Sequence, residues 1–443
     1  MPTAKIQSYT NLGVGAIAVE IEVHISAGLP AFNIVGMAET AVRESRERVR
    51  SAILNSNFEF PARRLTVNLA PADLPKQGGG FDLAIAIGVL VATNQLSIHP
   101  DHNCCFAAEL SLTGELRPIR GILPKAIECQ RAEITLVCAG GNLSELGLLL
   151  HSTQVLACDQ LLDLFSILQQ EPRERAQGRC SKPMPPSIHT DLENPLNLNQ
   201  IQGQSSAKKA LELAAAGGHN LLFVGPPGAG KSMLAKRMPS ILPDLDSQAA
   251  LESAVIYSVS GKPRKTVQQP PVRAPHHGAS SVSLVGGGSP PSPGEISLAH
   301  NGILFLDELP EFSPKVLEGL REPMENGEIT ISRAGHQACF PADFQFIGAM
   351  NPCPCGYYGT RRCECSSEQV NRYQRRVSGP LLDRIDMQVQ VNPPDNSALL
   401  RAGRAKVGRT EAGRTEAERT EAEQIKAGQT NTEENSALVK QRV

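Results

Sequence analysis

The sequence LLFVGPPGAGKSMLAKRM spans Leu221 to Met238 and predicts a strand, a glycine-rich loop and a helix in succession. The apolar run Leu221 to Val224 predicts the strand, and helix-forming residues from Met233 to Met238 predict the helix. The spacing G-x-x-x-x-G-K-[ST], typical of a phosphate-binding loop, is matched by Gly225, Gly230, Lys231 and Ser232.

In such a loop the glycines allow backbone N–H groups to turn toward a phosphate, and the helix N-terminus adds its positive dipole end. We expect Lys231 to reach the β- and γ-phosphates of ATP and Ser232 to hold Mg²⁺. An ordinary glycine turn is the alternative, which the flanking strand and helix disfavour. The predicted nucleotide-binding residues are consecutive: Gly225, Pro226, Pro227, Gly228, Ala229, Gly230, Lys231, Ser232 and Met233.

The length of 443 residues is enough for two or three domains, each with its own core. The formal net charge of −2 gives no overall sign of nucleic-acid binding, so DNA contacts would come from local patches or from a pore between subunits. No stretch approaches the ~20 apolar residues that span a bilayer, and the N-terminus lacks the features of a signal peptide. We therefore expect a cytoplasmic protein without a membrane partner, in which the odd number of cysteines, 11, suits reduced thiols better than disulfides.

The first ~170 residues mix strand and helix patterns, within the usual size of one domain. Apolar and polar residues alternate from Ile17 to Ile25, which predicts a half-buried strand with His24 on its solvent face. Glu39 to Ser56 predicts a helix, and Arg64 to Leu69 alternates again as a strand. A glycine-rich turn then opens a buried helix from Phe81 to about Ala92.

Further along this domain, Phe106 to Thr113 predicts a strand, Leu123 to Arg131 a helix and Ile134 to Cys138 a strand. Helical patterns continue to about Gln170. Residues 1–170 are therefore predicted to form one α/β or α+β domain.

The remaining chain divides by composition. Residues 171–196 carry five prolines without periodicity and predict a linker, and residues 197–395 form the predicted second domain. An RTEAx repeat of period five follows from Arg409 to Glu423, and it drifts by about 140° per repeat on a helix, so no apolar face forms. We expect residues 396–433 to be a disordered insert.

Two carboxylates follow a second apolar run, Ile303 to Leu306, in GILFLDELPEF. Asp307 is expected to hold the metal together with Ser232, and Glu308 to polarise a water for attack on the γ-phosphate. An ordinary strand end is the alternative, which the preceding phosphate loop disfavours.

Two further polar residues are candidates. Asn351 ends the apolar run Phe344 to Met350, and its amide is expected to position the attacking water unless it only forms a turn before Pro352. Arg384 either pairs with a nearby carboxylate or reaches the γ-phosphate of a neighbouring subunit as an arginine finger, and the whole pattern favours the finger.

Four cysteines are arranged as C-x-C-x7-C-x-C, at Cys353, Cys355, Cys363 and Cys365. This spacing suits a tetrahedral Zn²⁺ site, although the single-residue spacers are tighter than the common C-x2-C pattern, and reduced free thiols are the alternative. The residues between them form a basic and aromatic loop that either contacts DNA or caps the subunit.

Two other segments are candidates for contacts outside the nucleotide site. Residues 273–288 are polar and rich in Gly and Ser, which favours a functional loop, and its His276 and His277 are interpreted as loop or DNA-facing residues rather than metal ligands. Residues 327–335 predict a β-hairpin bearing Arg333, a common position for a pore loop.

Together the segments GPPGAGKS, GEISLAHNGILFLDELPEF, ENGEITISRAG, AMNPCPCGYYG and SGPLLDRID resemble the magnesium-chelatase-like AAA+ ATPases, in particular the YifB/ComM family. The resemblance implies a Lon-protease-like α+β domain followed by a P-loop AAA+ α/β domain with a parallel central sheet. It also implies a homohexameric, ATP-driven motor that branch-migrates DNA in natural transformation. Within that family the functional roles fall on Lys231, Ser232, Asp307, Glu308, Asn351 and Arg384.

The first domain departs from an active Lon-type protease. The turn that would hold the nucleophilic Ser reads Lys76 to Phe81 without any Ser or Thr, so peptide cleavage is not expected, although Lys125 falls near the position of a base. At the other end, residues 434–443 resemble the start of the family's helical lid. We expect a chain truncated before that lid, with hydrolysis and hexamer stability reduced.

Three functions remain open on the sequence: a DNA translocase or branch-migration helicase, a chelatase motor that drives metal insertion into a tetrapyrrole, and a non-catalytic interaction module. The first two share every nucleotide-binding residue, and the cysteine-rich loop and fused first domain favour the DNA motor.

Overall fold

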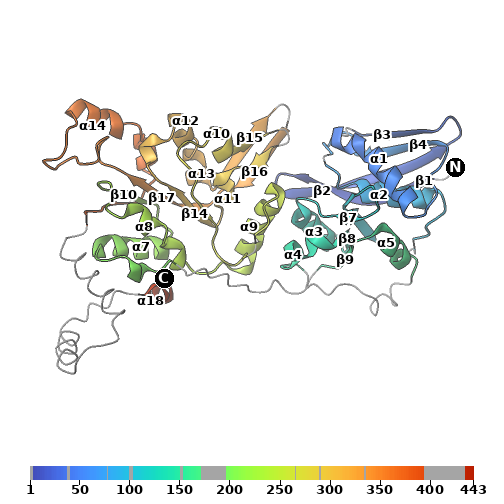
Figure 1. Cartoon of the computed structure of the whole chain (residues 1–443), viewed down its shortest axis with the longest axis horizontal. Helices are drawn as coiled ribbons and strands as arrows, with labels where there is room; N and C mark the ends of the chain where they lie inside the picture. The colour runs from blue at the N-terminus through green and yellow to red at the C-terminus, as the bar shows by residue number, and fades with distance from the viewer. Residues whose placement is uncertain are drawn as a thin grey trace, which may run out of the picture. The chain divides into compact units, whose positions relative to one another are not determined.

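The structure is a computed structural model that describes residues 3–36, 40–76, 78–98, 103–149, 153–170, 196–264, 266–288, 291–333, 336–393 and 435–443. They form two compact units (Figure 1). The first unit comprises residues up to 170 together with Leu251–Val267, and the second comprises the other described residues. The segment Leu251–Val267 thus groups with the first unit, although the sequence interpretation assigned it to the second domain.

The first unit is built on a mixed seven-stranded sheet of order β3-β4-β2-β1-β5-β8-β9. Its strands are β1 (Thr3–Leu12), β2 (Gly15–Ser26), β3 (Ala31–Val35), β4 (Arg64–Ala70), β5 (Cys104–Ala107), β8 (Thr135–Ala139) and β9 (Val155–Cys158), and a separate pair is β6 (Glu109–Leu110) with β7 (Leu116–Arg117). Strand β2 is antiparallel to both β1 and β4, whereas β5, β8 and β9 continue the sheet in parallel.

Helices cover both faces of this sheet. They are α1 (Thr40–Asn55), α2 (Asp82–Ala92), α3 (Ile122–Arg131), α4 (Leu143–Leu146), α5 (Leu161–Leu168) and most of α9 (Ser247–Ser260). Because side chains alternate along a strand, Ile6 packs in the core formed with α1, α2 and α5, whereas Tyr9 packs in the core formed with α3 and α9. Helix α2 lies against the sheet in Figure 1, and all of its residues except Val91 are buried.

The predicted fold class is confirmed for this unit, including the strand at Ile17 to Ile25 and the buried helix after the glycine-rich turn. Two details were wrong. The helical patterns predicted up to Gln170 are interrupted by β9, because a four-residue apolar run does not distinguish a strand from a helix by its period. The strand predicted over Phe106 to Thr113 is divided between β5 and β6 and ends in a turn at Gly114.

The second unit contains a five-stranded sheet of order β11-β14-β17-β10-β18. Its strands are parallel, which confirms the predicted parallel central sheet. Its strands are β10 (Leu221–Val224), β11 (Val272–Arg273), β14 (Gly302–Leu306), β17 (Phe344–Met350) and β18 (Met387–Gln390). Two short antiparallel pairs accompany it: β12 (Gly286–Gly287) with β13 (Ser292–Pro293), and β15 (Glu328–Arg333) with β16 (His336–Pro341). Because the five strands run in one direction, the segments after β10, β14 and β17 meet at one edge of the sheet.

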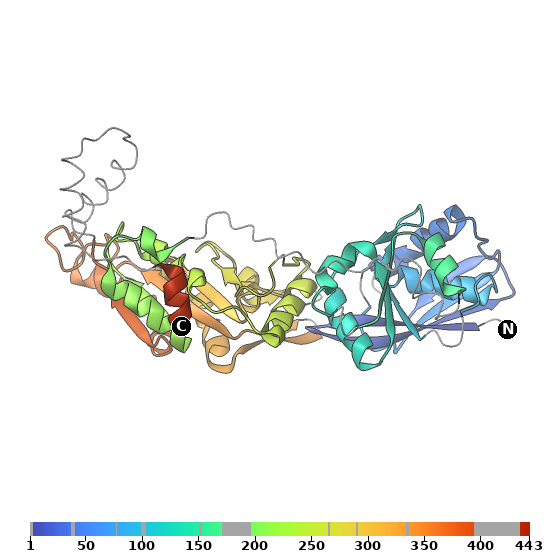
Figure 2. The same cartoon turned by 90° about the horizontal axis from the view of Figure 1, so that it is seen from below.

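The helices of this unit are α7 (Ser205–Gly217), α8 (Lys231–Ala235), α10 (Ser281–Val285), α11 (Glu295–Leu298), α12 (Pro314–Glu318), α13 (Arg321–Asn326), α14 (Ser367–Gln374), α15 (Gly379–Leu382) and α18 (Ser436–Arg442). Short 3-10 turns occur at Gly140–Asn142 in the first unit and at Leu198–Gln200, Met238–Ser240 and Leu309–Glu311 in the second. Figure 2 shows α18, in red, beside α7, in green, and Arg442 of α18 pairs with Glu212 of α7 at 2.8 Å.

Several predicted segments need comment. The predicted insert at 396–433 and the predicted linker, apart from Leu196, lie outside the described residues. The loop predicted over 273–288 contains the short helix α10, which begins after Ser280, whose Oγ accepts a hydrogen bond from Ser283 N. Each helix in the described part of the chain is too short or too polar to cross a membrane.

Candidate functional site

The phosphate loop connects β10, in the interior of the parallel sheet, to α8. Gly228 and Gly230 have φ angles of +78° and +94°, a left-handed conformation that glycine adopts without steric cost. A Cβ atom on Gly225 would lie 2.1 Å from the carbonyl oxygen of Val391, so this position has no room for a larger residue. The loop backbone therefore depends on the glycines that the motif contains.

Lys231 links the phosphate loop to the end of β17. Its Nζ donates hydrogen bonds to the carbonyl oxygens of Gly225 and Pro226, at 2.7 and 2.9 Å, and to Oδ1 of Asn351 at 3.0 Å. The residue is buried, and this burial lowers the pKa of its ammonium group, although the charges of Asp307 and Glu308 act in the opposite direction.

Ser232 links the phosphate loop to the end of β14, because its Oγ donates a hydrogen bond to Oδ2 of Asp307 at 2.6 Å. The other carboxylate oxygen of Asp307 accepts a hydrogen bond from the backbone N–H of Glu308 at 3.0 Å. A hydroxyl and a carboxylate in contact are the pair of hard oxygen ligands that Mg²⁺ uses in nucleotide sites. The donor set therefore fits a magnesium ion.

Glu308 has an unusual backbone, with a φ angle of +53° in the left-handed region. Such a conformation is uncommon for a residue with a side chain and often marks a functional position. The exposed Glu308 carboxylate lies 3.2 Å from Nδ1 of His277. The His277 ring lies against that of His276, with centroids 4.0 Å apart, and meets Phe312 edge-on.

The contact between His277 and Glu308 was not predicted. The sequence interpretation treated both histidines as loop or DNA-facing residues because no partner could be identified for them. Strand β11, which precedes them, has only two residues and gives no periodic signal. The sheet order explains the contact, because β11 is the neighbour of β14 and the segments after these two strands lie side by side.

Arg384 is held away from the phosphate loop by contacts with other elements. Its Nη2 pairs with the carboxylate of Glu325 on α13, and its Nη1 donates to the carbonyl oxygen of Pro380 at 2.7 Å. The ion pair lowers the pKa of Glu325. Its carboxylate partner is therefore Glu325, not the flanking aspartates: Oδ2 of Asp386 instead accepts a hydrogen bond from the backbone N–H of Asn220.

The four clustered cysteines lie together directly after β17. Their Sγ atoms are all within 4.8 Å of one another, with Cys353 at 3.3 Å from Cys355 and at 3.9 Å from Cys363. Four thiolates around Zn²⁺ with Zn–S bonds of about 2.3 Å would be about 3.8 Å apart. Backbone N–H groups of Tyr357 and Glu364 lower the pKa of Cys355 to about 6, whereas burial and the neighbouring thiols raise the pKa values of Cys363 and Cys365. The arrangement fits a four-thiolate zinc site.

The other predicted features are distributed over both units. The hairpin predicted over 327–335 is formed by β15 and β16, and the side chain of Arg333 lies outside the described residues. In the first unit, Lys125 is fully buried near the ring of Phe81, and its Nζ donates to the carbonyl oxygen of Tyr9. Burial lowers the pKa of the Lys125 ammonium group to about 8. Gly80, which precedes Phe81, offers no nucleophile beside this lysine.

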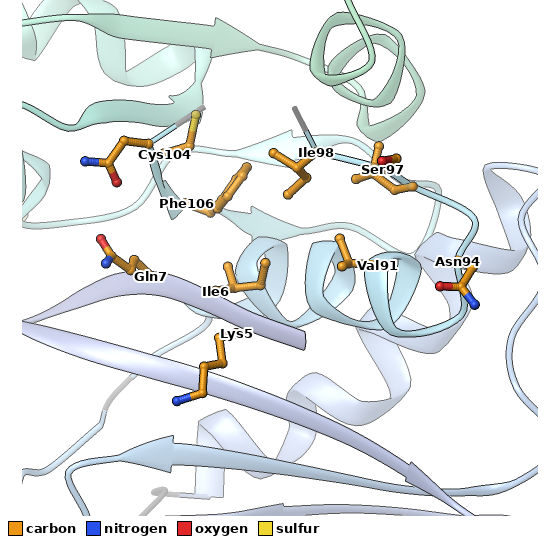
Figure 3. A pocket seen from close by; sticks show the side chains of 11 residues that line it. Lys5, Ile6, Gln7, Val91, Asn94, Ser97, Ile98, Cys104 and Phe106 are labelled. Carbon is orange, nitrogen blue, oxygen red and sulfur yellow. The ribbon is translucent and has the colours of Figure 1, made fainter. Parts of the chain in front are cut away.

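A pocket of about 700 Å³ also lies in the first unit (Figure 3). Figure 3 shows Val91 and Asn94 at the end of α2, with Ile6, Cys104 and Phe106 from the strands on the other side. The lining combines apolar side chains with amide groups and Lys5, and carries neither a carboxylate nor a histidine among the described residues. It supplies no acid or base chemistry comparable to that at the edge of the parallel sheet.

Comparison with known proteins agrees with this geometry. Residues 197–399 match the family described as "Magnesium chelatase, subunit ChlI", and residues 21–142 match "Subunit ChlI of Mg-chelatase". Competence protein ComM of Haemophilus influenzae is 47% identical over 393 residues, which is 88% of this chain and 77% of that protein. The uncharacterized protein YifB of Salmonella typhimurium is 47% identical over 399 residues, or 89% and 77% of the two chains.

A partial match of another kind is Lon protease 2 of Bacillus subtilis, which is 25% identical over 185 residues, or 36% of this chain. The predicted truncation before a lid remains a prediction. The identity to ComM and YifB extends across both units, so the chain belongs to the ComM/YifB family of magnesium-chelatase-like proteins.

Proposed function

We propose that the second unit binds and hydrolyses ATP at the edge of its parallel sheet. The observation that carries the proposal is the convergence of three strand ends: Ser232 bonds to Asp307 after β14, and Lys231 bonds to Asn351 after β17. Membership of a family named for magnesium chelatase subunits supports the same reaction.

In the proposed mechanism, Lys231 contacts the β- and γ-phosphate oxygens while the loop N–H groups surround the phosphates. Ser232 and Asp307 would hold Mg²⁺, which neutralises phosphate charge when bound. Glu308 accepts a proton from the water that attacks the γ-phosphorus, Asn351 orients that water, and ADP leaves with the bridging oxygen.

Arg384 acts in this proposal as an arginine finger in a homohexamer, reaching the nucleotide bound by a neighbouring subunit. The position of Arg384 supports this role, because the described hydrogen bonds of its guanidinium group are with Glu325 and Pro380 and none is with its own phosphate loop. The match to a magnesium chelatase subunit family supports an oligomer, in which a neighbouring subunit could supply the finger.

We further propose that ATP hydrolysis in the cytoplasm drives movement on DNA, with branch migration as the activity. The relative from Haemophilus influenzae is named competence protein ComM, and this name supports a role of the present chain in DNA uptake and recombination. The hairpin formed by β15 and β16 is the candidate element for a DNA contact. The family descriptions favour a chelatase-type motor as the second candidate. The cysteine cluster would hold Zn²⁺ in either case.

The test is ATP hydrolysis with and without branched DNA, using Lys231→Ala as the inactive reference. A DNA motor is expected to release phosphate several-fold faster with branched DNA. Substantial turnover that DNA does not change would favour the chelatase-type motor. Turnover no higher than that of Lys231→Ala would indicate a non-catalytic interaction module.

A further inference from the structure

The cysteine loop, defined as Cys353 to Cys365, is joined to the nucleotide site at two points. The first is covalent: Cys353 is separated from Asn351 only by Pro352, whose ring restricts the backbone between them. Cys353 is fully buried, and the carbonyl oxygen of Pro352 accepts a hydrogen bond from Nε2 of Gln374 on α14 at 3.0 Å. A fixed position for Cys353 therefore restricts where the Asn351 amide can lie.

The second connection is a contact with the phosphate loop itself. Gly356 has a φ angle of +84°, and a Cβ atom on it would lie 2.5 Å from Cδ and 3.2 Å from Cγ of Pro227. The backbone at Gly356, which follows Cys355 directly in the sequence, therefore lies against the ring of Pro227 in the phosphate loop. The ring is bonded to its own backbone nitrogen, so apart from changes in ring pucker it moves together with the phosphate loop.

These connections place the cluster beside groups that Lys231 already links. Its Nζ bonds both to Asn351, which precedes the cysteine loop, and to the carbonyl oxygen of Pro226, which precedes the contacted Pro227. The cysteine loop is thus connected to both groups that Lys231 joins: Asn351 and the phosphate loop. A loop of four thiols without a common ligand has no covalent restraint on this arrangement, whereas a bound metal ion supplies one.

We propose that Zn²⁺ held by Cys353, Cys355, Cys363 and Cys365 fixes the geometry of the nucleotide site. It fixes the position of the phosphate loop through the contact of Gly356 with Pro227, and it fixes the position of the Asn351 amide through Pro352. The inference rests on the proposed ATP site and adds a regulator to it. Loss of zinc weakens nucleotide binding without removing any residue that contacts the nucleotide.

A pair of glycines in the cysteine loop provides a matched test of the contact. Gly356 and Gly359 have nearly equal φ angles, +84° and +83°, so alanine has an unfavourable φ angle at both positions. Only Gly356 has a neighbour, since nothing lies within 4 Å of a Cβ atom at Gly359. Neither substitution removes a cysteine. The difference between Gly356→Ala and Gly359→Ala therefore reports on the contact with Pro227.

The experiment uses the full chain and measures two quantities: zinc per chain by mass spectrometry of the metal, and the Kd of a fluorescent ATP analogue. We expect one zinc in wild type and in both glycine variants, with Kd raised about tenfold in Gly356→Ala and less than about twofold in Gly359→Ala. Cys365→Ser is expected to lose zinc and to raise Kd, with its circular dichroism retained.

Three results would overturn the proposal. Zinc-free wild type after purification with added zinc would remove the metal, and equal Kd values for the two glycine variants would remove the contact as a control of binding. Loss of zinc in Cys365→Ser at unchanged Kd would make the metal a local feature. Wild type that holds zinc but binds no nucleotide would instead contradict the proposed ATP site, and the coupling with it.

Discussion

Replacing Lys231 by alanine is expected to weaken ATP binding severely. The Nζ atom is the donor in three hydrogen bonds of 2.7 to 3.0 Å that converge from the phosphate loop and from Asn351. In the nucleotide complex this ammonium group faces phosphate oxygens, and a hydrogen bond that involves charged groups contributes about 1.5–3 kcal/mol. The expected increase in Kd is therefore about 10- to 150-fold.

The assay is isothermal titration calorimetry of ATP with Mg²⁺ against the full chain. Lys209→Ala is the matched control, because Lys209 lies on α7 with its side chain 65% exposed and pairs only with Glu212 among the described ion pairs. The control is expected to bind ATP as wild type does. A Lys231→Ala protein that keeps its folded circular dichroism and binds ATP within threefold of wild type would refute the reasoning.

Three further predictions concern other parts of the chain. His277→Ala removes the partner that lies 3.2 Å from the Glu308 carboxylate, so basal ATP turnover is expected to rise about threefold at unchanged Kd for ATP. The control His276→Ala is expected to leave ATP turnover unchanged. A fall in kcat for His277→Ala would contradict the restraint of Glu308 by His277. Lys125 has a folded-state pKa of about 8, below its unfolded value, so the unfolded state binds more protons between about pH 8 and 10.5 and stability rises with pH. Relative to Lys125→Met, wild type should gain about 2 kcal/mol in urea unfolding free energy between pH 7.5 and 9.5, and a constant difference would exclude a buried, titrating lysine. Asp82 is fully buried at the start of α2 and pairs with Nε of Arg48 at 2.6 Å. Asp82→Ala should therefore lower the urea unfolding free energy of the first unit by about 3 kcal/mol. A loss equal to that caused by Asp163→Ala, at an exposed position, would show that the pair is not stabilising.

The parallel sheet could be predicted well because its strands are short apolar runs with clear ends. The run Leu221 to Val224 stops at glycine, and Ile303 to Leu306 stops at two carboxylates, so both the strands and the residues after them were evident. The convergence of Ser232, Asp307 and Asn351 then follows from the parallel direction of the strands.

Contacts that depend on the tertiary arrangement could not be predicted in the same way. The position of His277 beside Glu308 depends on β11, which is too short to give a pattern. The grouping of α9 with the first unit depends on apolar contacts of Ala254 and Val255. Apolar residues of this kind occur in any buried helix, so the sequence does not show which core they join. The cysteine spacing predicted a cluster, whereas the contact of Gly356 with Pro227 required the folded loop.

The account depends most directly on the edge of the parallel sheet being a site of ATP hydrolysis. Phosphate release by wild type and by Glu308→Gln, measured at saturating ATP and Mg²⁺ with branched DNA present, tests this claim. Turnover in wild type that falls about 100-fold or more in Glu308→Gln, with ATP still bound, is the predicted result. Equal phosphate release by the two proteins would contradict the assignment of Glu308 and the mechanism built on it.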